Sequence, residues 1–228
     1  MCLFFLFLYL LILNFKLHMK KVLFTTLALL AFGSIIAQDK DKPAKQIKFG
    51  SKLGMNVANL VGDDAGDAKD IIGFNAGLFV EIPISDKFTF QPEILYSAQG
   101  SKSEGPLNLD GTTYNVEATL KFNYINVPLM FKYHIANNFS LEAGPYVGFL
   151  TSSKLKFKVE GLGSDTVDMK DNMKSTDLGL GIGMNYEFSD IIFVNARYQG
   201  GLTEIGDVDA GGNKIKNSVF QIGLGFRF

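Results

Sequence analysis

The final twelve residues alternate strictly between apolar and small or polar side chains. One face would carry Ser218, Phe220, Ile222, Leu224, Phe226 and Phe228, and the other Asn217, Val219, Gln221, Gly223, Gly225 and Arg227. Side chains alternate with period two along a β-strand, so this segment predicts a strand with one apolar face. In a soluble sandwich that face would pack on a second sheet, whereas in a membrane barrel it would face lipid. A chain that ends on the aromatic residue of its last strand favours the barrel.

Seven earlier segments have the same character. The predicted strands are Ile47–Asn56, Gly73–Ile84, Phe88–Gln99, Leu120–His134, Phe139–Leu150, Thr176–Phe188, Ile192–Gly201 and Asn217–Phe228. Strands of soluble proteins usually have about 5–6 residues, whereas a tilted strand that crosses a membrane needs about 9–11. The predicted strands have the greater length.

The connections between these segments alternate between long and short. Long loops are predicted at Val57–Ile72, Gly100–Thr119, Thr151–Ser175 and Leu202–Lys216, and tight turns at Ser85–Lys87, Ile135–Asn138 and Ser189–Ile191. Bacterial membrane barrels have short periplasmic turns and longer outer loops. The sequence therefore predicts an all-β fold, an eight-stranded antiparallel up-and-down transmembrane β-barrel over residues 47–228, with both ends on the short-turn side.

Charged residues fall on the face of these strands that would line the lumen. They are Glu81, Glu93, Lys132, Glu142, Asp177, Glu187, Arg197 and Arg227. Burying a charge is costly unless it is paired, so we expect one network of ion pairs and hydrogen bonds that plugs the barrel. The alternative is an ion path or a catalytic carboxylate pair. Eight strands leave room only for side chains or one small ligand, which argues against an open pore.

Composition excludes several classes of function. The formal net charge is -1, so bulk charge does not direct the chain to nucleic acid. The single cysteine is Cys2, in a segment predicted to be removed, so no disulfide or cysteine-based metal site is expected. The acidic loop Gly62–Asp70 lacks the spacing of a calcium loop. His134 is predicted beside a short turn, so no histidine-based catalysis is expected near the outer loops, and we expect neither an enzyme nor a cofactor or metal.

The N-terminus resembles an export signal. Met19–Lys21 is a short basic region, Val22–Phe32 is apolar, and Gly33–Ala37 is a stretch of mostly small residues before Gln38. We expect residues 1–37 to be an N-terminal extension and a cleaved signal peptide, with Met19 as the start of translation or, alternatively, a genuinely long signal. Residues 38–46 would form a short periplasmic tether.

Three strand motifs resemble those of the PorT-type outer-membrane β-barrel family. They are Phe122–Tyr133 (FNYINVPLMFKY), Leu141–Phe149 (LEAGPYVGF) and Ala196–Thr203 (ARYQGGLT), in the family's order. The resemblance covers about Ile47–Phe228 and implies an eight-stranded barrel like OmpA and OmpX, with no catalytic motif. It implies an outer-membrane location and lipid as a partner. The machinery that assembles such barrels would recognise Phe226 and Phe228.

The predicted role is structural or interactive, through extracellular loops. The alternatives are a barrel that binds a small ligand in its mouth and an accessory component of a protein secretion system. Extracellular or secretion-apparatus partners are therefore possible, and nucleic acid is not expected.

Overall fold

The computed structural model describes residues 46–109, 112–206 and 214–228. The predicted signal peptide, almost all of the predicted tether and the segment Asp207–Asn213 lie outside the described residues. None of the helices within the described ranges combines the length and the apolar character needed to cross a membrane.

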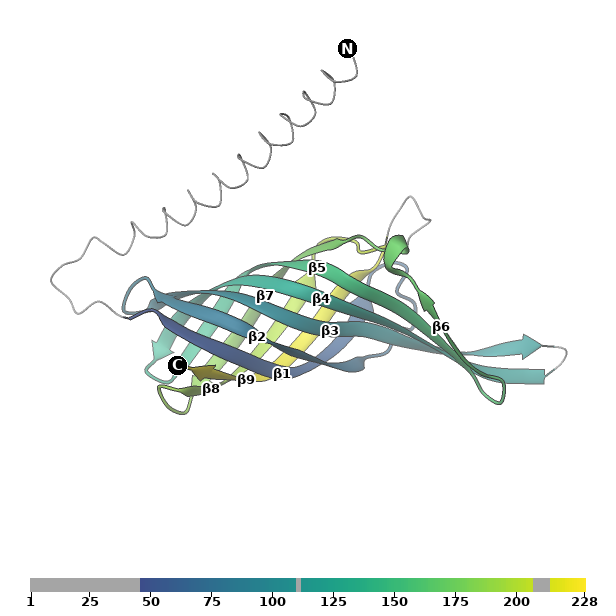
Figure 1. Ribbon diagram of the computed structural model, residues 1–228, viewed down its shortest axis with the longest axis horizontal. Coiled ribbons are helices and arrows are strands. Elements are labelled where there is room, and N and C mark those ends of the chain that lie inside the picture. Colours follow the sequence, from purple (N-terminus) through teal and green to yellow (C-terminus); the bar gives the residue numbers. More distant parts are fainter. Residues whose placement is uncertain (1–45, 110–111, 207–213) are drawn as a thin grey trace, which may run out of the picture. The chain divides into compact units, whose positions relative to one another are not determined.

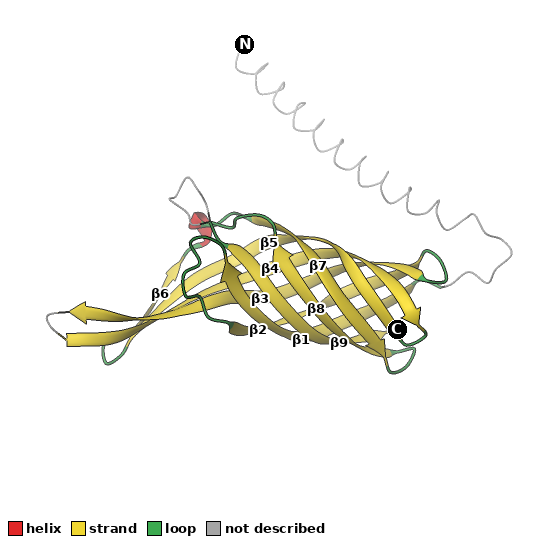
Figure 2. Cartoon of the chain, turned by 180° about the vertical axis from the view of Figure 1, so that it is seen from behind, coloured by secondary structure: helices red, strands yellow, loops and turns green. Residues whose placement is uncertain are grey.

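Nine strands and one short 3-10 helix make up the described part of the chain (Figures 1 and 2). They are β1 (Lys48–Val61), β2 (Ile71–Pro83), β3 (Phe88–Leu109), β4 (Thr112–Ala136), β5 (Phe139–Val159), β6 (Gly163–Asp168), η1 (Lys170–Asn172), β7 (Thr176–Glu187), β8 (Ile192–Gly201) and β9 (Lys216–Arg227). Eight of them, all except β6, pair antiparallel in a closed ring. The ring closes where β1 pairs with β9, from Gly50 opposite Arg227 to Val61 opposite Lys216. The predicted eight-stranded fold is confirmed.

Short turns lie at one end of the ring, which we call the turn end, and the opposite end is the loop end. Two of the turns have the same Ser-Asp start. The Ser85 hydroxyl accepts hydrogen bonds from the backbone N–H groups of Lys87 and Phe88. The Ser189 hydroxyl accepts the equivalent pair from Ile191 and Ile192. A serine at the start of a turn satisfies backbone donors in this way, which explains why the strands reverse at these points.

Two of the predicted long loops are largely strand, which corrects the sequence analysis. Residues 100–119 continue β3 and β4, and Thr151–Ser175 contains the end of β5, all of β6 and η1. These four strands project beyond the ring at the loop end (Figure 1), and we call residues 101–109, 112–120, 154–159 and β6 the extension. The period-two alternation of apolar Leu155 and Phe157 with Lys154 and Lys156 continues through β5, but the high polar content obscured it.

The two faces of the ring differ as predicted. On β9, Phe220, Ile222 and Leu224 are exposed on the outer face, whereas Gln221 and the neighbouring glycines are buried inside. At the turn end the backbone N–H of Phe228 donates to the carbonyl of Phe49 (2.9 Å), so the last residue continues the pairing of β9 with β1. The wall thus has an apolar outer surface and a polar interior.

Candidate functional site

The turn end of the lumen is filled by a charge cluster around Glu81. Lys132 donates to Glu81 Oε1 (3.0 Å), and Arg227 donates to both carboxylate oxygens (2.8 and 3.1 Å). Arg227 also donates to Glu187 (2.8 Å). The Phe193 ring lies near both cations, with its centroid 4.7 Å from Lys132 Nζ and 4.6 Å from Arg227 Cζ. Ion pairing and cation–π contact therefore hold this cluster together.

A second cluster, centred on Arg197, crosses the middle of the lumen. Its terminal nitrogens donate to Glu93 (2.9 and 2.7 Å) and its Nε to Glu142 (2.6 Å). The side chains of all three residues are fully buried. Asn185 and Asn195 also donate to Glu142 (2.9 and 3.0 Å). These contacts join β3, β5, β7 and β8 across the barrel.

Lys52, which the sequence analysis omitted, belongs to this central cluster. It lies on β1, its side chain is 2% exposed, and its Nζ is 3.4 Å from Glu93 Oε1. Its inclusion gives the two clusters four cations and four carboxylates, so their formal charges cancel. The full sets are Lys52, Lys132, Arg197 and Arg227 against Glu81, Glu93, Glu142 and Glu187. The signal for Lys52 was its position between Gly50 and Gly54, in phase with Asn56 on the inner face of a strand.

Two glycines on β7 lie beside the central cluster. A Cβ placed on Gly181 would lie 3.7 Å from Arg197 Cδ and 3.4 Å from Met130 Cε. A Cβ on Gly183 would come within 3.0 Å of Glu142 Oε1. The Gly-x-Gly-x-Gly segment of β7 therefore serves packing inside the lumen.

Asp177 lies apart from both charge clusters, nearer the loop end. Its carboxylate accepts hydrogen bonds from Tyr146 (3.1 Å), Asn217 (2.9 Å) and Thr203 (3.1 Å). In the described part of the chain, no lysine or arginine nitrogen lies within ion-pair distance of it. Neutral donors, rather than a cation, thus satisfy this buried group.

An apolar cluster is buried at the loop end of the lumen. Its buried members are Leu60, Phe122, Tyr124, Leu150, Ile205 and Ile215. Backbone hydrogen bonds join the loops that supply it: the N–H of Ile205 donates to the Ile215 carbonyl (2.9 Å), and the N–H of Lys174 to the Ile205 carbonyl (2.8 Å). The N–H of Lys214 donates to the Asp64 carboxylate (2.8 Å), which links the acidic loop to the segment that contains Ile215. We call these residues the apolar cap.

Ion pairs and hydrogen bonds hold the charged side chains of the lumen. His134, at the turn end, lies 3.0 Å from Thr89 Oγ1 and far along β4 from the apolar cap. Among the described residues, no group of three or more His, Cys, Asp or Glu side chains is placed to hold a metal ion.

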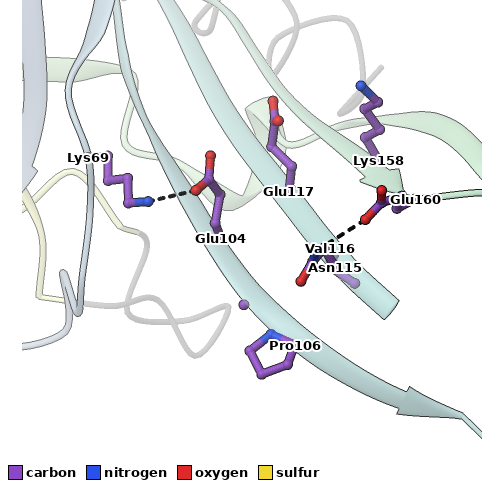
Figure 3. A pocket seen from close by; sticks show the side chains of 9 residues that line it. Lys69, Glu104, Pro106, Asn115, Val116, Glu117, Lys158 and Glu160 are labelled. Atoms are coloured by element: carbon purple, nitrogen blue, oxygen red, sulfur yellow. Dashed lines mark hydrogen bonds and ion pairs between the residues drawn. The ribbon is translucent and has the colours of Figure 1, made fainter. Parts of the chain in front are cut away.

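The extension carries a pocket of about 560 Å³ on its outer side (Figure 3). It is lined by Lys69, Glu104, Gly105, Pro106, Asn115, Val116, Glu117, Lys158 and Glu160. Glu104 pairs with Lys69 (2.6 Å) and Lys102 (2.7 Å), and these two lysines lower the pKa of its carboxyl to about 2. The pocket is thus a polar surface hollow whose charges are largely paired.

Comparison with known proteins assigns the chain to a family. The family described as "Outer membrane protein beta-barrel domain" matches residues 36–207. Curated proteins give no match. Among solved structures, Ail, the attachment invasion locus protein of Yersinia pestis, is similar over 81% of this chain and 100% of its own, with 16% identity and a TM-score of 0.49. Neisserial surface protein A is similar over 81% and 100%, with 11% identity and a TM-score of 0.47. At these values the likenesses say nothing about activity.

Proposed function

This chain belongs to the outer membrane protein beta-barrel domain family, and we propose that it is a non-conducting anchor that holds the extension outside the membrane as a contact surface. The observation that carries the proposal is that β3 and β4 stay paired well beyond the ring, from Ser101 opposite Leu120 to Leu109 opposite Thr112. A barrel that served only as a wall would need no such sheet.

One face of the extension continues the inner face of the ring. This face exposes apolar side chains, which supports the contact role. Leu107, Phe157 and Val167 are 39%, 37% and 44% exposed. The strand β6 is exposed along its whole length. Exposed apolar side chains gathered on one surface typically mark an interaction site.

Closure of the lumen supports the non-conducting part. Two charge clusters and the apolar cap lie in series along the barrel axis, and a permeating ion would have to break each of them. Reconstituted protein should give no large, stable conductance in planar bilayers. Steady porin-sized currents would contradict the proposal.

The contact role is tested by shortening the extension. Replacing Glu104–Glu117 by a two-residue turn leaves the ring pairs of β3 and β4 intact, so the variant should still fold and show heat-modifiable mobility on gels. Pull-downs from detergent-solubilised outer membrane should recover a defined partner with the intact protein and lose it with the shortened one. Recovery of the same partner with both would refute the assignment.

A second candidate, binding of a small polar ligand, is favoured by the pocket on the extension. The apolar cap fills the mouth of the ring, so such a ligand would lie on the extension instead. If a Lys158→Gln variant no longer binds the small polar ligand but the pull-down still recovers the protein partner, the result favours ligand binding by the pocket.

We also propose that the chain is a PorT-type barrel and that it is exported with a cleaved signal peptide. The order of the three motifs on β4, β5 and β8 supports a PorT-type barrel and, with it, an accessory role in secretion. The N-terminal pattern supports cleavage before Gln38, which sequencing of the mature N-terminus tests. The aromatic residues Phe226 and Phe228 would be read by the barrel-assembly machinery, and their deletion should sharply reduce the amount of folded protein in the membrane.

A further inference from the structure

Three lysines form a patch at the base of the extension, on the outer side of the wall. Lys121 on β4 is directly opposite Lys154 on β5, and Lys156 follows two residues further along β5. All three side chains are exposed. We call these three residues the lysine patch.

The lysine patch lies on the same face as the apolar outer surface of the ring. On β4, Phe122 and Tyr124 are buried inside, so Lys121 shares the outer face with Ile125. Ile125 is paired with Phe149, which is 46% exposed on the same face. This pair is the last apolar pair of the two strands before the polar residues of the extension.

Geometry places the patch at the depth of lipid headgroups. Four residues separate Lys121 from Ile125, which is about 13 Å along a strand and about 10 Å along the membrane normal for a strand tilted by about 40°. The headgroup layer begins where the hydrocarbon ends, and a lysine can lower its ammonium group along a flexible stem to reach it. The ammonium groups therefore meet the polar layer directly above the apolar band.

The protein balances the charges of the patch only in part. Further along the extension, Lys102 pairs with Glu104 (2.7 Å) and Glu117 (3.0 Å). In the described part of the chain, none of the three patch lysines has a carboxylate within ion-pair distance. The acid next in register is Asp168, opposite Lys154, and its carboxylate accepts a hydrogen bond from the backbone of Lys170.

Like charges directly opposite one another on paired strands are destabilising unless an anion lies between them. We propose that the lysine patch binds phosphate-bearing headgroups of the lipids in the outer leaflet. Lipid is the ligand that fits, because the patch continues the lipid-facing surface of β4 and β5 and faces away from the apolar side of the extension. Phosphates held there would fix the height of the barrel and position the extension above the bilayer.

The test is a binding measurement on the full chain, folded and extracted from outer membrane into detergent micelles. Diphosphoryl lipid A is the probe, and isothermal titration gives its dissociation constant. The variant Lys121→Gln/Lys154→Gln/Lys156→Gln removes the patch, and Lys48→Gln/Lys87→Gln/Lys214→Gln removes the same charge from exposed lysines elsewhere. Heat-modifiable gel mobility shows that both variants are folded.

The patch variant should bind diphosphoryl lipid A roughly 100-fold more weakly, because each lysine near an anionic surface contributes about fivefold. The control variant should bind like the wild type, and binding should weaken as salt is raised. Unchanged affinity of the patch variant, or an equal loss in the control, overturns the proposal. Equally tight binding of inorganic phosphate, or displacement of the lipid by polyglutamate at equal charge, would show that free phosphate or an acidic polypeptide is the ligand instead.

Discussion

Replacing Arg197 by Met should cost more stability than any other single substitution in the lumen. The guanidinium makes three hydrogen bonds to two buried carboxylates, and Met fills a similar volume without a charge. After its removal Glu93 retains Lys52 at 3.4 Å, and Glu142 retains only two asparagine amides. One uncompensated negative charge is left in the central cluster. Breaking a buried ion pair on one side costs about 3–5 kcal/mol, and we expect a loss in this range.

Urea unfolding of the protein in lipid vesicles, followed by gel mobility, measures this loss. The informative comparison is the double variant Arg197→Met/Glu142→Gln, which restores a neutral cluster. If uncompensated charge is the cause, the double variant is more stable than Arg197→Met although it carries one more substitution. A loss below about 1 kcal/mol, or a double variant no more stable than the single one, would refute the electrostatic account of the plug.

Three further predictions concern packing, the lipid face and pH. Gly225→Ala would place a Cβ against the Phe193 ring, well inside van der Waals contact, so it should lower the free energy of unfolding in urea by about 1–3 kcal/mol. Gly105→Ala, with no atom within 4 Å of its Cβ, should change it little. Leu224→Arg puts a charge on the outer face of β9 and, near the bilayer midplane, should lower the free energy of unfolding by about 2–4 kcal/mol. Membranes that hold as much folded variant as folded wild type would contradict this. The pKa of Glu104 is lowered to about 2, so its ion pairs stabilise the extension above its usual pKa of 4.5 and are lost as pH falls from there toward 2. Amide protection in the extension, expressed relative to the intrinsic exchange rate at each pH, should fall over that range in the wild type and change less in Glu104→Gln.

The wall of the barrel was predictable because its determinants are local. Whether a residue such as Phe220 or Gln221 faces outward or inward depends only on its parity along the strand. The turns at Ser85 and Ser189 are likewise set by contacts between residues two or three apart. Strand count, order and antiparallel pairing follow from these local signals with no knowledge of distant contacts.

The extension was missed for a reason that is also physical. Its strands carry polar side chains on one face because that face meets water or headgroups, and a polar segment between two apolar strands resembles a loop. Only the pairing of Thr119 with Lys102 and Lys156 shows that both sides of the segment are hydrogen-bonded into a sheet.

The sequence by itself determined the ring, its two faces and most of the charges that line it, since each depends on period two along a single strand. Only the tertiary structure decided which side chains pair with one another. Glu93 meets Arg197 from across the barrel, 104 residues away, Lys52 completes the charge balance, and Asp177 stands apart among neutral donors. The packing of Ile205 and Ile215 into the apolar cap is of the same kind. Such contacts depend on the register and curvature of the closed sheet, which bring together side chains from distant strands, and no single strand carries that information.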